Sequence, residues 1–193
     1  MKKLNIHLMI GVISLFLITS CNSSEKTFGE NIGEWGTYGD AEWEFSNNEL
    51  TGKITDGDGF VITKQTYKDF ILEVEFKPDS TINSGIFVRC QKENEINPMN
   101  CYELNIWDLH PDQNNRTGAI VTKTKPLAQV ETIDKWNTYK IKMENAFIKV
   151  WINGILTADA RDHSLSEGYI GLQAKGTGKV SFRNLKIMPL EVK

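Results

Sequence analysis

The sequence is poor in the side chains that most metal sites use, with three histidines and three cysteines in 193 residues. None of them forms a cluster with the spacing of a metal site. The chain also lacks a cluster of basic residues, which argues against nucleic acid as the main partner. We therefore expect no metal, no cofactor and no nucleic-acid partner.

One turn has aspartates at a spacing that can hold calcium, in Asp56-Gly57-Asp58-Gly59. The acidic ligand that a calcium loop needs further along the chain is missing at the expected spacing. The segment is therefore interpreted as a plain turn, and a structural calcium ion is unsupported.

No segment has a convincing helical period, and apolar and polar residues instead alternate in short runs. Roughly ten such runs, separated by turn signals, predict an all-β sandwich or barrel. The expected strands cover residues 43–45, 49–54, 60–63, 70–77, 83–90, 101–108, 118–122, 136–143, 147–152, 155–156, 169–174 and 180–187. Asn153-Gly154 favours a type I′ hairpin turn. A change of phase around Arg183 and Asn184 predicts a β-bulge.

Residues 1–20 are predicted to be a secretory signal peptide, because two lysines precede an apolar run that ends at small residues. The run is too short and wrongly flanked for a membrane-spanning helix. Its end, Leu17-Ile18-Thr19-Ser20-Cys21, resembles the bacterial lipobox. That resemblance implies cleavage before Cys21 and acylation of this cysteine. The alternative is an ordinary leader whose cysteine is incidental.

The lipobox resemblance predicts an exported protein that is anchored through its N-terminal lipid in the bacterial cell envelope, facing the periplasm or the cell surface. Residues 21–34 are interpreted as a flexible tether between the lipid and the domain, which is expected over residues 35–193. Removing the leader takes away two lysines and no acid. The mature chain then has 20 basic and 25 acidic side chains, a net charge of −5.

The two other cysteines, Cys90 and Cys101, flank one loop, and an exported protein with two thiols usually pairs them. Alternation puts Cys90 on the face of Val88 and Cys101 on the face of Glu103. A regular hairpin would therefore point them to opposite sides, and a disulfide needs a bulge or a relaxed strand end. Two free thiols remain the alternative.

The stretch from Asn83 to Asp108 contains the pattern that most suggests a site. Successive strand side chains point to opposite faces, so each of its two strands should turn one apolar face into the core. Those apolar faces carry Ile86, Val88, Tyr102, Leu104 and Ile106. The opposite faces carry Gly85, Phe87, Arg89, Glu103, Asn105 and Trp107. A surface with this chemistry is a candidate site for a mono- or oligosaccharide.

The spacing of the acids bears on which reaction such a site performs. Ordinary glycoside hydrolysis needs two carboxylates that flank the scissile bond. On one strand they would lie at even spacing, but the same-face neighbour of Glu103 is Asn105, and Asp108 is an odd number of residues away. This pattern weakens the interpretation as an ordinary glycosidase.

Several segments, in the same order along the chain, resemble the 3-keto-disaccharide hydrolase domain family. They are Tyr67-Lys68-Asp69-Phe70, Asn83-Ser84-Gly85-Ile86-Phe87-Val88-Arg89, Tyr102-Glu103-Leu104-Asn105-Ile106-Trp107-Asp108, Thr117-Gly118-Ala119-Ile120, Trp136-Asn137, Asn153-Gly154, Gly168-Tyr169-Ile170-Gly171-Leu172-Gln173 and Phe182-Arg183-Asn184. The resemblance covers about residue 43 to the C-terminus. It implies a concanavalin A-like jelly-roll sandwich of two antiparallel sheets.

The resemblance also implies a reaction that needs one base and a group to hold a developing enolate. A ketone at C3 of a sugar acidifies the proton on C2; loss of that proton lets the C1 substituent leave, and water then adds. The residues implied for this work lie on the concave face. Glu103 is the candidate base with Arg89 as its expected cross-strand neighbour, Lys175 and His110 are further catalytic candidates, and Asn105, Trp107, Asp108 and Gln173 are candidates for binding the sugar.

Two departures from the family pattern keep a second interpretation open. Asn105 stands where the family usually has glutamine, and Lys175 stands where it often has histidine. The alternative to an enzyme is therefore a non-catalytic, lectin-like glycan-binding lipoprotein on the same fold. A purely structural envelope protein is a third possibility.

Overall fold

The structure is a computed structural model that describes residues 26–27, 33 and 35–190. The predicted signal peptide, the acylation of Cys21 and most of the predicted tether lie outside these residues. Within the described ranges, no helix is long and apolar enough to cross a membrane.

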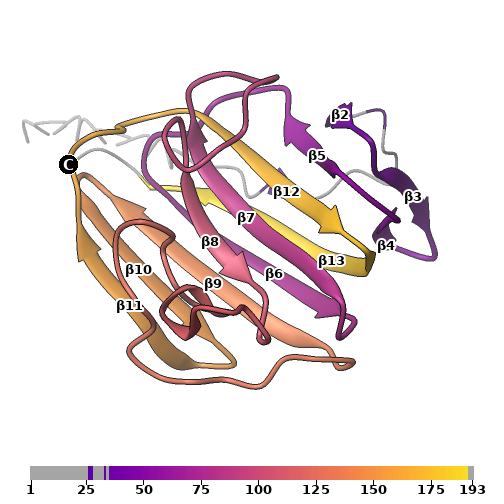
Figure 1. The fold of residues 1–193 in the computed structure, drawn as a ribbon. Coiled ribbons are helices and arrows are strands. Elements are labelled where there is room, and N and C mark those ends of the chain that lie inside the picture. Colours follow the sequence, from indigo (N-terminus) through magenta and orange to yellow (C-terminus); the bar gives the residue numbers. More distant parts are fainter. Residues whose placement is uncertain (1–25, 28–32, 34, 191–193) are drawn as a thin grey trace, which may run out of the picture.

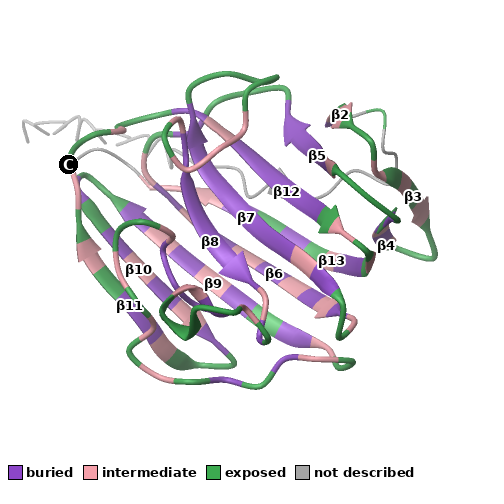
Figure 2. Cartoon of the chain, in the orientation of Figure 1, coloured by how far each residue is buried: buried purple, intermediate pink, exposed green. Residues whose placement is uncertain are grey.

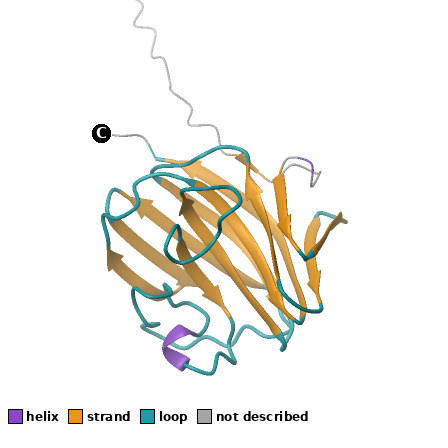
Figure 3. Cartoon of the chain, turned by 45° about the horizontal axis from the view of Figure 1, so that its top comes forward, coloured by secondary structure: helices purple, strands orange, loops and turns teal. Residues whose placement is uncertain are grey.

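The described chain is built almost entirely from strands (Figure 1). They are β1 (Lys26–Thr27), β2 (Trp35–Gly39), β3 (Glu42–Ser46), β4 (Glu49–Ile54), β5 (Asp58–Thr63), β6 (Phe70–Pro78), β7 (Ile82–Cys90), β8 (Tyr102–Ile106), β9 (Asn137–Glu144), β10 (Phe147–Ile152), β11 (Ile155–Arg161), β12 (Tyr169–Gly176) and β13 (Gly178–Pro189). A short 3₁₀ helix, η2 (Gln113–Asn115), interrupts the long connection between β8 and β9 (Figure 3).

The strands form two antiparallel sheets that pack face to face, which confirms the predicted all-β sandwich. One sheet has the order β11-β10-β9-β6-β13-β4-β3, with β1 beside β13. The other has five strands in the order β2-β5-β12-β7-β8, and it lies in front in Figure 1. β7 and β8, predicted to carry the site, are neighbours at one edge of the five-stranded sheet.

The core lies between the sheets and follows the predicted alternation of apolar residues. On β6, Phe70, Leu72, Val74 and Phe76 are almost fully buried, while the residues between them are half-buried. Burying each such side chain stabilises the fold by roughly 1.5–3 kcal/mol. Figure 2 shows the same banding along β9 and β10. The period-two pattern therefore fixes which face of each strand is internal.

Local geometry follows the sequence at two predicted places. Asn153 and Gly154 have φ angles of 51° and 80°, as a type I′ hairpin turn requires. The register of β13 against β6 shifts between Arg183 and Lys186, so the predicted bulge is confirmed. Residues 118–122, in contrast, form no regular strand, and Ile120 makes only isolated bridges to Leu104 and Thr124.

Candidate functional site

The site is built on the outer face of the five-stranded sheet, the side turned away from the core. The strand register sets two rows of side chains across this face. One row runs Tyr38, Phe60, Gln173, Gly85, Asn105, and the next runs Gly36, Ile62, Gly171, Phe87, Glu103. Glu103 thus stands beside Phe87 and diagonal to Gly85, and a Cβ added at Gly85 would lie 3.6 Å from the Glu103 Cγ and 3.4 Å from the Phe87 ring. The ring of Phe87 and the side chain of Glu103 therefore pack over the glycine.

The Glu103 side chain is only 9 % exposed. Burial raises the pKa of its carboxyl group to about 7, although the charge of Lys175 acts in the opposite direction. In the described part of the chain, no group donates a hydrogen bond to this carboxylate. A carboxylate with a pKa near 7 and free lone pairs is suited to accept a proton from a ligand at neutral pH.

Two amide side chains on the same outer face have side-chain oxygens without a hydrogen-bond partner. The Oε1 atom of Gln173 and the Oδ1 atom of Asn83 are buried and have no hydrogen-bond partner. Gln173 is the cross-strand neighbour of Gly85, and Asn83 precedes Gly85 by two residues on β7. Buried polar atoms are nearly always paired, so these two point to a ligand that supplies donors. Asn83 was not predicted, but its position two residues before Gly85 put it on this face.

Lys175 lies on the neighbouring strand β12, directly opposite Asn83 in the sheet. It is exposed. Its ammonium group is close enough to lower the pKa of Glu103. The structure therefore brings together three predicted site residues, Glu103, Gln173 and Lys175, whose roles remain predictions.

The predicted cross-strand pair of Arg89 and Glu103 is wrong, because the neighbour of Glu103 is Phe87. Arg89 has a positive φ of 53°. The register of β12 against β7 shifts here, with one extra residue on β7. This bulge turns Arg89 off the outer face and into the protein, where it is fully buried. There it pairs with Asp69 at 2.9 Å and donates to the carbonyls of residues 68, 145 and 165.

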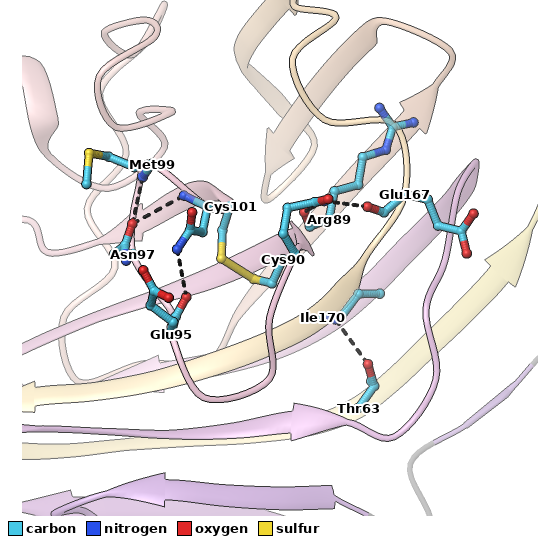
Figure 4. The surroundings of a disulfide bond; sticks show 11 residues. Thr63, Arg89, Cys90, Glu95, Asn97, Met99, Cys101, Glu167 and Ile170 are labelled. Atoms are coloured by element: carbon cyan, nitrogen blue, oxygen red, sulfur yellow. Dashed lines mark hydrogen bonds between the residues drawn. A yellow bond between two sulfur atoms is a disulfide. The ribbon is translucent and has the colours of Figure 1, made fainter.

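The same bulge brings the two cysteines together. The extra residue turns Cys90 to the outer face, where Cys101 also lies, and the structure joins them in a disulfide (Figure 4). In Figure 4 the Arg89 side chain points away from this bond. The sequence analysis required a bulge or a relaxed strand end for this disulfide, and the structure has the bulge.

Two predicted sugar-binding residues have structural partners instead. Asn105 is buried, its amide donates to the carbonyl of Asn115, and its Oδ1 accepts from a backbone amide. Asp108 accepts from both the backbone amide and the hydroxyl of Thr132. These contacts tie the long connection between β8 and β9 to the sheet, and they give both side chains protein partners.

Trp107 and His110 follow the C-terminal end of β8, and both are half-buried. Their rings meet edge to face at 4.6 Å. The Nδ1 atom of His110 accepts from the amide of Asp112 at 3.0 Å. Trp107 follows the residue that pairs with Ser84, and so lies near Asn83. A role in stacking on a sugar or in catalysis stays a prediction for both.

A second surface feature lacks the buried, unpartnered atoms found at Gln173 and Asn83. A polar hollow of about 540 Å³ lies on the outer face of the eight-stranded sheet and includes Glu44, Lys53 and Ser181. Its polar side chains include an ion pair and bonded hydroxyls, and none has a buried atom without a partner. In the described part of the chain, no group of three or more His, Cys, Asp or Glu is placed to hold a metal ion.

Several solved structures with the same fold have the names of carbohydrate-active or carbohydrate-binding proteins. A "Putative glycosyl hydrolase" from Parabacteroides distasonis is 25% identical, with a TM-score of 0.72, and the match covers 86% of this chain and 100% of that chain. The carbohydrate-binding module CBM66 from Bacillus subtilis is 20% identical, with a TM-score of 0.62, over 79% of this chain and 93% of that chain. A β-glucanase from Bacillus licheniformis is 16% identical, with a TM-score of 0.59, over 86% and 98%. None of the curated proteins matches the chain.

These likenesses confirm the jelly-roll fold predicted from the sequence. The model of one family, described as the 3-keto-alpha-glucoside-1,2-lyase-like domain, matches residues 23–188, which is most of the chain. The chain therefore belongs to the 3-keto-alpha-glucoside-1,2-lyase-like family and is a carbohydrate-active domain of glycosyl hydrolase type.

Proposed function

We propose that this protein cleaves 3-keto-glycosides, with Glu103 as the base that removes the proton from C2. The observation that carries the proposal is the buried Glu103 carboxylate, whose pKa is raised to about 7 on the outer face of the five-stranded sheet, close to Gly85. Family membership supports the substrate class. The unpartnered oxygens of Gln173 and Asn83 suit the hydroxyl donors of a sugar.

The reaction balances without a cofactor. Glu103 takes the C2 proton, and the electron pair of that bond forms an enolate with the C3 ketone. The enolate collapses back to the C3 ketone, a C1–C2 double bond forms, and the C1–O bond breaks as the leaving oxygen takes a proton from solvent. Water then adds at C1 and gives a proton to solvent, and the proton held by Glu103 returns to C2, which gives the free 3-keto sugar. Only one base is needed, and the same carboxyl group can return the proton.

The surroundings of Glu103 suit a single base better than a pair of carboxylates. Asp108, the next acid along the chain after Glu103, accepts two hydrogen bonds from Thr132. Lys175 is the cation that influences Glu103, now that Arg89 is excluded from the site. We assign Lys175 to the developing negative charge on the oxygen of C3, where a positive charge lowers the energy of the enolate.

The test uses the purified domain and a 3-keto-disaccharide, and it follows release of the keto sugar. Wild type is expected to turn over, and Glu103→Gln is expected to lose at least about 100-fold in kcat, the range of general-base catalysis. Glu42→Gln, an exposed acid on β3, is the matched control and should keep full activity. Turnover that survives in Glu103→Gln would refute the assignment of the base.

The burial of Arg89 away from the site favours a second candidate, a non-catalytic sugar-binding domain. With Arg89 removed, an exposed lysine is the cation left to stabilise an enolate. Calorimetry on the same variants separates the two functions. Saturable binding of the 3-keto-disaccharide without turnover, weakened by Gln173→Ala, would support binding alone.

We also infer that the domain is held at a membrane through acylated Cys21. The motif before this cysteine supports the inference. Cys21→Ser should move the protein from the membrane fraction to the soluble fraction of the cells that export it. Retention of the variant in the membrane fraction would refute lipid anchoring at this residue.

A further inference from the structure

A hollow of about 510 Å³ lies on the outer face of the eight-stranded sheet, where β6, β9 and β10 run side by side (Figure 1). It is on the other side of the sandwich from Glu103, which belongs to the five-stranded sheet. Its volume is within the range of sites for small ligands. The residues that line it, here called the Trp151 hollow, are Glu73, Thr138, Lys140, Trp151, Asn153 and Gly154.

Trp151 is a large aromatic residue on the solvent side of its strand. The residues before and after it on β10 are fully buried, so alternation turns Trp151 outward, where it is half-buried. In the described part of the chain, no hydrogen bond, aromatic ring or cation engages its indole. Trp136, directly before β9 on the same face, differs: the guanidinium of Arg183 stacks on its ring at 3.9 Å, and the ammonium of Lys77 lies 4.8 Å from the ring centre. The protein thus covers one tryptophan of this face with its own cations and leaves the other available to a ligand.

The turn between β10 and β11 forms one wall of the Trp151 hollow, and hydrogen bonds hold it against β9. The backbone amide of Asn153 donates to the carbonyl of Thr138 at 2.9 Å, and its Oδ1 atom accepts from the amide of Thr138 at 2.9 Å. The Nδ2 atom of Asn153 donates to Oδ1 of Asn137 at 2.9 Å. Among the described residues, none has an atom within 4 Å of the position that a Cβ at Gly154 would take, so the space beside the turn is open. The hollow is therefore preformed.

The polar groups around Trp151 carry no net charge. Lys140, the cross-strand neighbour of Trp151, pairs with Glu73 at 2.8 Å, and both side chains are partly exposed. The exposed hydroxyl of Thr138 has no partner within the described chain. An anion such as a phosphate would need an excess of positive charge here, and a lipid chain would leave these polar groups without hydrogen bonds. A pyranose ring matches both features, because its C–H groups form an apolar face and its hydroxyls donate and accept hydrogen bonds.

From this arrangement we propose that the Trp151 hollow is a second carbohydrate-binding site, which takes a neutral sugar ring flat against the indole of Trp151. Membership of a carbohydrate-active family supports a glycan as the ligand. The two sites lie on opposite faces of the sandwich, so one molecule can hold a glycan through Trp151 while the face of Glu103 stays accessible. Binding here needs no chemistry at Glu103, and it is compatible with either function proposed above.

Calorimetry with a neutral, β-1,4-linked glucose tetrasaccharide tests the site. Wild type is expected to bind it saturably, and Trp151→Ala should weaken binding at least about tenfold, the usual effect of truncating a central tryptophan anchor. Thr138→Val keeps the shape of the side chain and removes one hydroxyl, so it should weaken binding about fivefold, as for one lost hydrogen bond. Phe147→Ala is the matched control, because Phe147 is a 45 % exposed aromatic on the same face of β10, about 13 Å along the strand and outside the hollow. It should bind as wild type does.

Three results would overturn the second site. The first is no binding by wild type at millimolar tetrasaccharide, and the second is equal affinity of wild type, Trp151→Ala and Thr138→Val; if Trp151→Ala does not fold, Thr138→Val alone decides. The third is binding that Gln173→Ala weakens and Trp151→Ala does not, which would place the sugar on the five-stranded sheet instead. Tighter binding of a tetrasaccharide of uronic acids than of the neutral one would overturn the assignment to neutral sugars. Each of these results leaves the turnover assay of Glu103→Gln, and with it the proposed function, to be judged separately.

Discussion

The burial of Glu103 has a consequence for stability that requires no substrate. Its carboxyl group is ordinary in the unfolded chain, with a pKa of 4.5, and burial raises that pKa to about 7 in the folded chain. The folded chain therefore binds this proton more tightly than the unfolded chain does. Between these two values, the free energy of unfolding falls as the pH rises.

The magnitude follows from the two pKa values. One pKa unit corresponds to about 1.4 kcal/mol, so ionised Glu103 costs about 3 kcal/mol once the pH exceeds the folded value. The side chain is only 9 % exposed, so solvent screening reduces this little. Glu103→Gln has nearly the same shape and no charge to bury. It should therefore be more stable than wild type at pH 8 by about 3 kcal/mol, and the two should differ little at about pH 4.

Urea unfolding of both proteins at pH 4, 6 and 8, followed by tryptophan fluorescence, measures the difference. Glu42→Gln, on the exposed edge of β3, should track wild type at every pH. If Glu103→Gln and wild type lose or gain stability in parallel across this range, Glu103 is not desolvated and the raised pKa is refuted. The base proposed for catalysis would then lose its main support.

Three further outcomes are expected. In wild type, kcat/KM should rise with pH through a midpoint near 7 as Glu103 ionises. Lys175→Met should move that midpoint upward, because the ammonium group lowers the pKa of Glu103. An unchanged midpoint in the variant would contradict the interaction between Lys175 and Glu103. Arg89→Met should reduce the free energy of unfolding, measured in urea, by roughly 3–5 kcal/mol, because it leaves the buried carboxylate of Asp69 without its cation. A loss below about 1 kcal/mol would contradict the structural role of Arg89. Replacing Cys90 and Cys101 together by serine should lower the free energy of unfolding by roughly 3 kcal/mol, as expected for a disulfide that joins residues 11 apart. If reduction leaves the urea midpoint of wild type unchanged, the disulfide is contradicted.

The structure changes which side chains surround Glu103 more than it changes the position of Glu103 itself. Glu103 keeps its predicted face, but the cation predicted beside it is buried with Asp69 elsewhere. The candidate site consists of one carboxylate, two amides and one exposed lysine on the outer face close to Gly85. That composition suits a single proton transfer on a polyhydroxylated ligand, and Trp107, the predicted stacking partner, follows β8 and lies near Asn83.

Alternation of apolar and polar residues by itself determined the β-sandwich, the internal face of each strand and the outward position of Glu103. It did so because a strand side chain can point to only two sides, and water excludes the apolar set from one of them. The turn at Asn153-Gly154 was also encoded locally, since few residues adopt positive φ readily.

The positions of Arg89 and Cys90 depend on the tertiary structure. Alternation along a strand no longer predicts which face a residue occupies once one extra residue enters the strand. The bulge on β7 therefore reverses the faces of both Arg89 and Cys90. No local signal fixes that bulge: it is stabilised by Asp69, by carbonyls of residues 68, 145 and 165, and by the bond to Cys101 across the loop. Burial likewise depends on contacts between distant segments, so the raised pKa of Glu103 emerges only once the strands have packed.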